Sequence, residues 1–113
     1  MRRAGLLRSG LLLMCVLPLA AVRAGDIPEF ALSVKAHQFE PAELVIPAAT
    51  KVKLIIHNLD AAPEEFESYE LKREKVIPGQ SSGLLFIGPL APGTYPFFGD
   101  FNPETARGHL LVK

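Results

Sequence analysis

The amino-acid sequence predicts an all-β protein that folds as a Greek-key antiparallel β-sandwich. Short runs in which apolar and polar residues alternate recur along the chain, as expected of strands that bury one face. Nine of the ten prolines and seven of the nine glycines fall in residues 25–113, which disfavours long helices there. Turn residues separate the runs, and seven or eight short strands in about 89 residues are typical of a sandwich.

The first 24 residues are predicted to form a secretory signal peptide, which leaves residues 25–113 as one domain. The segment begins with positive charge, and its apolar stretch at 11–21 is short for a bilayer span, which takes about 20 residues. An uncleaved anchor is the alternative. Cys15 is not expected to carry a lipid, because Met14 is bulky where a lipoprotein signal has a small residue. We therefore expect export to a periplasmic or extracellular space, with the periplasm preferred.

Charge and composition exclude several classes of function. The first 24 residues contain four arginines and no acid, so the remainder has eight basic residues against 12 acidic ones, a balance unsuited to nucleic acid. The only cysteine and both methionines also lie in that segment, so the predicted domain has no thiolate for a disulfide, a nucleophile or a metal. Ser81 and Ser82 have no histidine near them in sequence, and no phosphate-binding glycine loop is present, so neither predicts an active site.

The first half of the domain contains three predicted strands. Every second residue is apolar in 30–36 and again in 52–56, which predicts two strands with one buried face each. A shorter apolar run at 44–46 lies between Pro41 and Pro47, and the prolines limit its length.

The second half contains one charged segment and three apolar runs. The charged segment 70–75 is predicted to lie at a sheet edge, where charge discourages association with other strands. The run 83–87 is continuously apolar, which predicts a strand buried on both faces. The run 93–98 follows a turn at 91–93, and 110–112 forms the last strand.

Three stretches resemble the cupredoxin family, and in particular its small EfeO-type branch. They are FEPAELVIPA at 39–48, NLDAAPEEFES at 58–68 and GTYPFFGDFNPETARG at 93–108. The resemblance implies a β-sandwich with a metal site at one tip. For an EfeO-type domain it also implies a place in bacterial iron uptake, with iron or copper bound through acidic residues. A membrane iron permease or another periplasmic iron-transport component is the implied partner.

The positions of the blue-copper ligands are occupied by other residues in this chain. Blue-copper members of the family bind copper with two histidines, one cysteine and usually an axial methionine. In order along the chain, the matching positions hold Glu64, Gly99, Asn102, and Thr105 or Ala106. Because blue copper requires a thiolate, we expect no type 1 copper site here.

Carboxylates remain as the candidate metal ligands. They are Glu64, Glu65, Glu67, Asp100 and Glu104. The two loops that carry them adjoin in the resembled fold, and oxygen ligands favour hard cations such as Fe³⁺, Mn²⁺ or Ca²⁺. Strand alternation predicts that Glu64 points inward with Phe66, where an unpaired carboxylate is costly. Glu65 and Glu67 have the opposite parity, and a bulge would be needed to bring them to the same face.

Each candidate also has a structural alternative. Glu64, Glu65 and Glu67 could be solvent-facing acids. Glu104 would lie in a short helical turn expected near residues 103–107, where the helix dipole favours a carboxylate. Asp60 is predicted to be a turn or cap residue. The histidines, which are His37, His57 and His109, are expected to be exposed and not to bind metal.

Three functions are consistent with these observations. The preferred one is a binding module that holds iron or copper at an acidic tip and exchanges the ion with a membrane iron-transport partner. The second is an accessory role in Fe²⁺ oxidation, which would need bound copper or a partner as the electron acceptor. The third is a metal-free interaction domain that keeps the fold alone.

Overall fold

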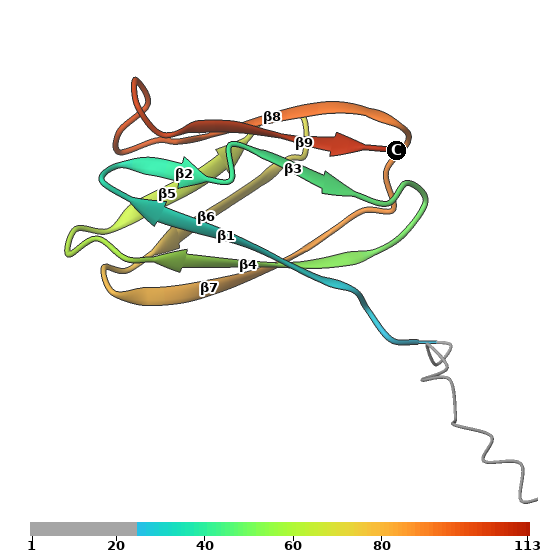
Figure 1. Ribbon diagram of the computed structural model, residues 1–113, viewed down its shortest axis with the longest axis horizontal. Helices are drawn as coiled ribbons and strands as arrows, with labels where there is room; N and C mark the ends of the chain where they lie inside the picture. The colour runs from blue at the N-terminus through green and yellow to red at the C-terminus, as the bar shows by residue number, and fades with distance from the viewer. Residues whose placement is uncertain (1–24) are drawn as a thin grey trace, which may run out of the picture.

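A computed structural model describes residues 25–113, and the predicted signal peptide at 1–24 lies outside the described residues. The described chain forms nine strands arranged as two facing sheets (Figure 1). The strands are β1 (Glu29–Lys35), β2 (Gln38–Glu40), β3 (Glu43–Ile46), β4 (Val52–Asn58), β5 (Glu64–Ser68), β6 (Arg73–Ile77), β7 (Ser81–Ile87), β8 (Gly93–Gly99) and β9 (Arg107–Val112). One sheet has the order β2-β1-β4-β7 and the other the order β3-β9-β8-β5-β6. The predicted all-β sandwich is therefore confirmed.

Two strand pairs are parallel, which the prediction of an antiparallel sandwich did not include. β1 pairs with β4 in parallel, and β3 pairs with β9 in parallel. The cause is the passage from β2 to β3, in which the chain changes sheets at Pro41 and Ala42 without reversing direction (Figure 1). β4 then returns in the direction of β1. Alternation of apolar residues reports which face is buried and carries no information on strand direction.

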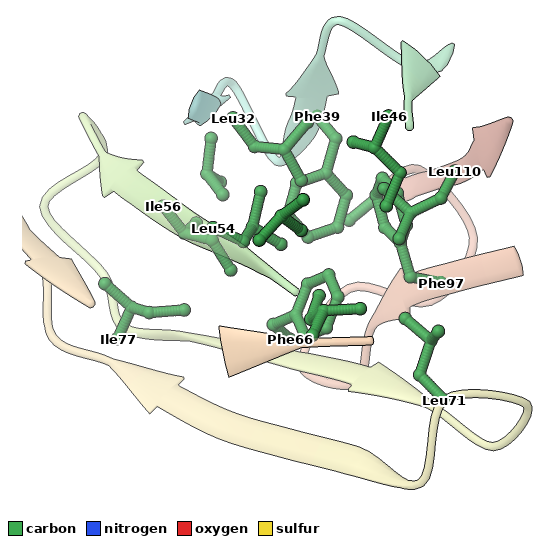
Figure 2. Packing of buried hydrophobic residues seen from close by; sticks show 14 of the residues in the cluster. Leu32, Phe39, Ile46, Leu54, Ile56, Phe66, Leu71, Ile77, Phe97 and Leu110 are labelled. Atoms are coloured by element: carbon green, nitrogen blue, oxygen red, sulfur yellow. The ribbon is translucent and has the colours of Figure 1, made fainter. Parts of the chain in front are cut away.

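The core is one cluster of buried apolar side chains between the two sheets (Figure 2). The aromatic rings of Phe39, Phe66 and Phe97 meet at its centre. The centroid of Phe97 lies 5.0 Å from that of Phe39 and 5.1 Å from that of Phe66. These side chains come from β2, β5 and β8, so the aromatic contacts join the two sheets.

Strand β6 is an edge strand, as its charge predicted. It is the last strand of the larger sheet, and four of its five residues are exposed. Strand β7 was predicted to be buried on both faces, and this prediction is wrong. Its Leu84 and Phe86 side chains are 40% and 41% exposed. β7 is an edge strand of the smaller sheet, and no layer covers its outer face in the described chain. The ammonium groups of Lys51 and Lys53 lie 4.9 and 5.9 Å from the centre of the Phe86 ring.

The helical turn predicted near 103–107 is a single hydrogen-bonded turn rather than a helix. The carbonyl oxygen of Asn102 accepts hydrogen bonds from the backbone N–H groups of Thr105 and Ala106, at 3.3 and 2.9 Å. Strand β9 begins at Arg107, so Gly108 belongs to the strand and does not end a helix. Within residues 25–113 no helix is long and apolar enough to cross a membrane.

Candidate functional site

The tip of the sandwich is formed by the loops 59–63 and 100–106 with the adjoining ends of β5 and β8. Glu64 is the first residue of β5 and Gly99 is the last of β8. The two strands are antiparallel neighbours in which Phe66 is paired with Gly99. This register brings the two loops together, although about 40 residues separate them along the chain.

Glu64 lies inside the tip, as strand alternation predicted, and is 1% exposed. Its Oε1 atom accepts hydrogen bonds from the backbone N–H groups of Glu65 and Phe101, both at 3.0 Å. Its Oε2 atom accepts a hydrogen bond from the side-chain amide of Asn102 at 2.6 Å. No buried side-chain polar atom in the described chain lacks a partner. The buried carboxylate is therefore satisfied by donors from β5 and from the loop 100–106.

Gly99 leaves room for this carboxylate. A β-carbon at position 99 would lie 2.6 Å from the Cδ atom of Glu64 and 2.7 Å from the Cβ atom of Ala106, closer than such atoms approach in proteins. The positions that the resemblance matches with the copper ligands therefore do converge in space. Glu64 already fills the space beside Gly99.

Glu65 and Glu67 lie on the opposite face of β5 and meet Asp100 there. One carboxylate oxygen from each of these three residues lies within 4.8 Å of the other two, and we call this group the acidic trio. Asp100 is held in place by its backbone N–H, which donates to the carbonyl oxygen of Glu65 at 2.8 Å. Glu74 is the residue of β6 directly paired with Glu67. No bulge was needed to gather the trio, because Asp100 joins it from the loop.

Two acids of the trio, Glu65 and Glu67, have raised pKa values. The pKa of Glu65 is raised, first by partial desolvation and then by the charges of Asp100 and Glu74. The pKa of Glu67 is raised by desolvation and then by the charges of Asp100 and Glu65. Carboxyl groups with raised pKa values ionise less readily, and a nearby cation would stabilise their ionised form.

Of the five predicted ligands, the structure thus brings three together. Glu64 points to the other side of the sheet and is hydrogen-bonded there. Glu104 is exposed in the turn that precedes β9 and is not part of the trio. Any single ion bound by the trio would have neither of these two carboxylates among its ligands in this arrangement.

Asp60 is a turn-stabilising residue, as predicted. Its carboxylate accepts hydrogen bonds from the backbone N–H groups of Ala36 at 2.8 Å and His37 at 2.9 Å. These two residues connect β1 to β2 and have φ angles of 50° and 56°, which is costly without glycine. The hydrogen bond from the His37 backbone is the main reason that the pKa of Asp60 is lowered. Asp60 therefore offsets strain in the turn.

The structure reveals one polar pair that sequence reasoning missed. His57 and Ser82 are paired residues of β4 and β7, and the His57 Nδ1 and Ser82 Oγ atoms are 2.6 Å apart. Only the register between the two strands could have indicated this contact. A hydrolytic triad would also need an acidic group that orients the imidazole, and none of the ion pairs among the described residues includes His57. The other two histidines contact acids, His37 at Asp60 and His109 at Glu43.

Comparisons with known proteins agree with this fold. Residues 8–112 match the Cupredoxin-like domain family. A Rickettsia prowazekii (strain Madrid E) protein, RP394, is 44% identical over 88 residues, which cover 78% of this chain and 70% of that protein.

Among solved structures, the metal binding domain of the Cu(I)-exporting P-type ATPase from Streptococcus pneumoniae D39 has a TM-score of 0.67 at 13% identity, with 75% of this chain and 84% of that chain covered. Auracyanin A, a "blue" copper protein from Chloroflexus aurantiacus, has a TM-score of 0.65 at 12% identity, with 78% and 100% covered. At these identities the structural likeness shows the fold alone. The match over residues 8–112 shows that the chain belongs to the family of cupredoxin-like domains.

Proposed function

We propose that this protein binds a metal ion through the acidic trio on the outer face of its tip. The observation that carries the proposal is the approach of three carboxylate oxygens, one each from Glu65, Glu67 and Asp100, to within 4.8 Å of one another. Without a cation the three charges repel one another, and this repulsion adds to partial desolvation in raising the pKa values of Glu65 and Glu67. A bound cation would turn the repulsion into attraction and draw the three oxygens together.

The ligand chemistry favours a hard or borderline ion. Three carboxylate oxygens with water at the remaining positions suit Fe³⁺, Fe²⁺, Mn²⁺ or Cu²⁺. They do not suit Cu⁺, which prefers sulfur ligands, and residues 25–113 contain neither cysteine nor methionine. The ion in this proposal is iron or Cu²⁺, held at the surface where it can be exchanged.

The biological setting in this proposal is iron uptake in the bacterial periplasm. Its support is the sequence resemblance to EfeO-type domains and the predicted signal peptide at 1–24. A membrane iron permease or another periplasmic iron-transport component would receive or supply the ion. The same fold occurs in a metal binding domain of a Cu(I)-exporting ATPase, which supports metal handling as the general role.

A titration of the purified protein tests the proposal. Fe³⁺ (as citrate), Fe²⁺, Cu²⁺ and Mn²⁺ would be added in turn, with stoichiometry measured by calorimetry and stability by thermal unfolding. We expect saturable one-to-one binding of at least one ion, which at a hundredfold excess over the dissociation constant stabilises by about 2.7 kcal/mol. Glu67→Gln should weaken this binding at least tenfold, which corresponds to about 1.4 kcal/mol.

The matched control is Glu104→Gln, which removes an exposed acid of the same tip outside the trio. It should leave the affinity unchanged. Equal losses in the two variants would point to general attraction by negative charge instead of a site. If no ion shifts the melting temperature, the proposal is wrong. An assay of Fe²⁺ oxidation with and without Cu²⁺ separates simple binding from assisted oxidation.

A further inference from the structure

The copper of the blue-copper members does not fit the corresponding residues of this chain. The matching positions supply one carboxylate, from Glu64, and one side-chain amide, from Asn102. Gly99 and Ala106 supply no ligand atom and Thr105 supplies only a hydroxyl, so the thiolate and both imidazoles of such a site are missing. The structure adds that the carboxylate already accepts three hydrogen bonds.

An ion at this position would have to displace those hydrogen bonds. The backbone N–H of Phe101 and the amide of Asn102 both point at the carboxylate from the loop 100–106. Both groups are hydrogen-bond donors, so a cation bound beside the Glu64 carboxylate would face the positive ends of two N–H dipoles. Both bonds are part-buried, and each donor that lost its acceptor would give up a hydrogen bond to a charged group.

We propose that the Glu64 carboxylate takes the place of a metal ion as the group that holds the tip together. In a metal site, one ion would join the start of β5 to the end of β8 and to the loop that follows. Here two hydrogen bonds to the Glu64 carboxylate, from Phe101 and Asn102, join the start of β5 to the loop that follows β8, and the third, from Glu65, lies within β5. Hydrogen bonds to an anion are stronger than those between neutral groups. We call this set of three hydrogen bonds the Glu64 tie.

Gly99 is the second part of the arrangement. With the Glu64 carboxylate in place, a β-carbon at position 99 would lie 2.6 Å from Cδ and 2.7 Å from Oε1. The family's cysteine side chain and the Glu64 side chain thus compete for the same space. Glutamate at 64 and glycine at 99 therefore form a matched pair in this chain. This inference concerns the inner face of β5 and is independent of metal binding by the trio.

Amide hydrogen exchange measured by NMR on the metal-free protein, with a chelator present, tests the tie. The Phe101 N–H should be protected without any metal. Glu64→Gln and Asn102→Ala, which each weaken the tie, should speed exchange at Phe101 about tenfold, the change expected for one hydrogen bond to a charged group. Glu104→Gln is the control from the same loop and should leave that rate unchanged.

Metal titration of Glu64→Gln completes the test. Affinity and stoichiometry for iron and Cu²⁺ should match those of the wild-type protein, whether or not the trio binds an ion. Protection of Phe101 that is lost in the chelator and restored by added metal would overturn the inference. Exchange at Phe101 that is unchanged in both Glu64→Gln and Asn102→Ala would also overturn it. Asn102→Ala removes only a side-chain amide and so serves if Glu64→Gln does not fold.

Discussion

Glu64 and Glu65 are adjacent in the chain, but they differ in burial, in hydrogen bonding and in the charges around them. Glu64 faces the interior and its carboxylate accepts three hydrogen bonds. Glu65 faces outward and meets the like charges of Glu67 and Asp100. Strand alternation separates the two side chains, and the partners on each face then determine the role of each. Two adjacent acids thus give one structural anion and one candidate ligand.

The two faces respond to charge in opposite ways. A buried carboxylate is tolerated only when donors replace its hydration, and the tip supplies three of them to Glu64. The outer acids keep contact with water but repel one another, so a cation is what would stabilise them. Substitutions on the inner face should therefore act on stability, and substitutions on the outer face mainly on ion binding.

The largest expected effect is that of Glu64→Ala. The substitution leaves the Phe101 N–H and the Asn102 amide without their acceptor and opens a cavity in the tip. We expect the free energy of unfolding to fall by about 2–6 kcal/mol, because each of two neutral donors that loses its acceptor costs about 1–3 kcal/mol. Chemical denaturation measures this loss. Glu65→Ala is the matched variant on the outer face, and a loss of similar size there would contradict the comparison.

Gly99→Ala should be the next most damaging substitution. Its methyl group would overlap the Glu64 carboxylate and the Ala106 side chain, and one of them would have to move. We expect a loss of about 1–3 kcal/mol, which is the usual range for overpacking a well-filled interior. Thermal and chemical unfolding report the loss. An unchanged stability would mean that the carboxylate can leave its donors freely, contrary to the Glu64 tie.

Asp60→Asn extends the comparison to a carboxylate that is hydrogen-bonded near the surface. Its two hydrogen bonds support a strained turn, so we expect a loss of about 1 kcal/mol, similar to the loss of a helix cap. The pKa of Asp60 is lower in the folded protein, so its stabilising effect is complete above the unfolded value, near 3.8. This effect disappears as the pH falls through the folded value. Melting temperatures of the wild-type and the variant should therefore differ at pH 6 and converge in strong acid.

Glu67→Gln should have the smallest effect on stability, and in the opposite direction. The pKa of Glu67 is raised in the folded protein, so the ionised form destabilises the fold once the pH rises above the unfolded value, near 4.5. The variant lacks this penalty. In the presence of a chelator we expect its melting temperature to be slightly above that of the wild-type at neutral pH and equal to it well below pH 4.5. A variant that melts lower at neutral pH would contradict this prediction, because it would mean that the ionised Glu67 side chain does not destabilise the fold.

Sequence patterns predicted much of this fold and part of the candidate site. Alternation in 30–36 and 52–56 correctly indicated strands with one buried face, and it placed Glu64 inward and Glu65 outward. The charge of 70–75 correctly indicated an edge strand. These predictions succeeded because they depend on residues that are close together in the sequence. Side chains alternate between the two faces along one strand, and a run of charged residues favours the edge of a sheet.

The two predictions that failed, and the one contact that was not predicted, depend on where distant segments lie. The outer face of β7 is apolar and still exposed, because no layer of the described chain covers it. The parallel pairing of β1 with β4 depends on a change of sheet between β2 and β3 that alternation does not record. The contact between His57 and Ser82 depends on the register of β4 against β7.

By itself, the sequence determined that the chain is a β-sandwich and that residues 25–113 hold no thiolate. It also determined which acids of β5 point inward and which point outward, since that follows from parity along one strand. Only the tertiary structure decided that Asp100 joins Glu65 and Glu67, and that Phe101 and Asn102 donate to Glu64. The physical reason is that these contacts join β5 to a loop far along the chain, and strand register and loop path set which atoms meet there.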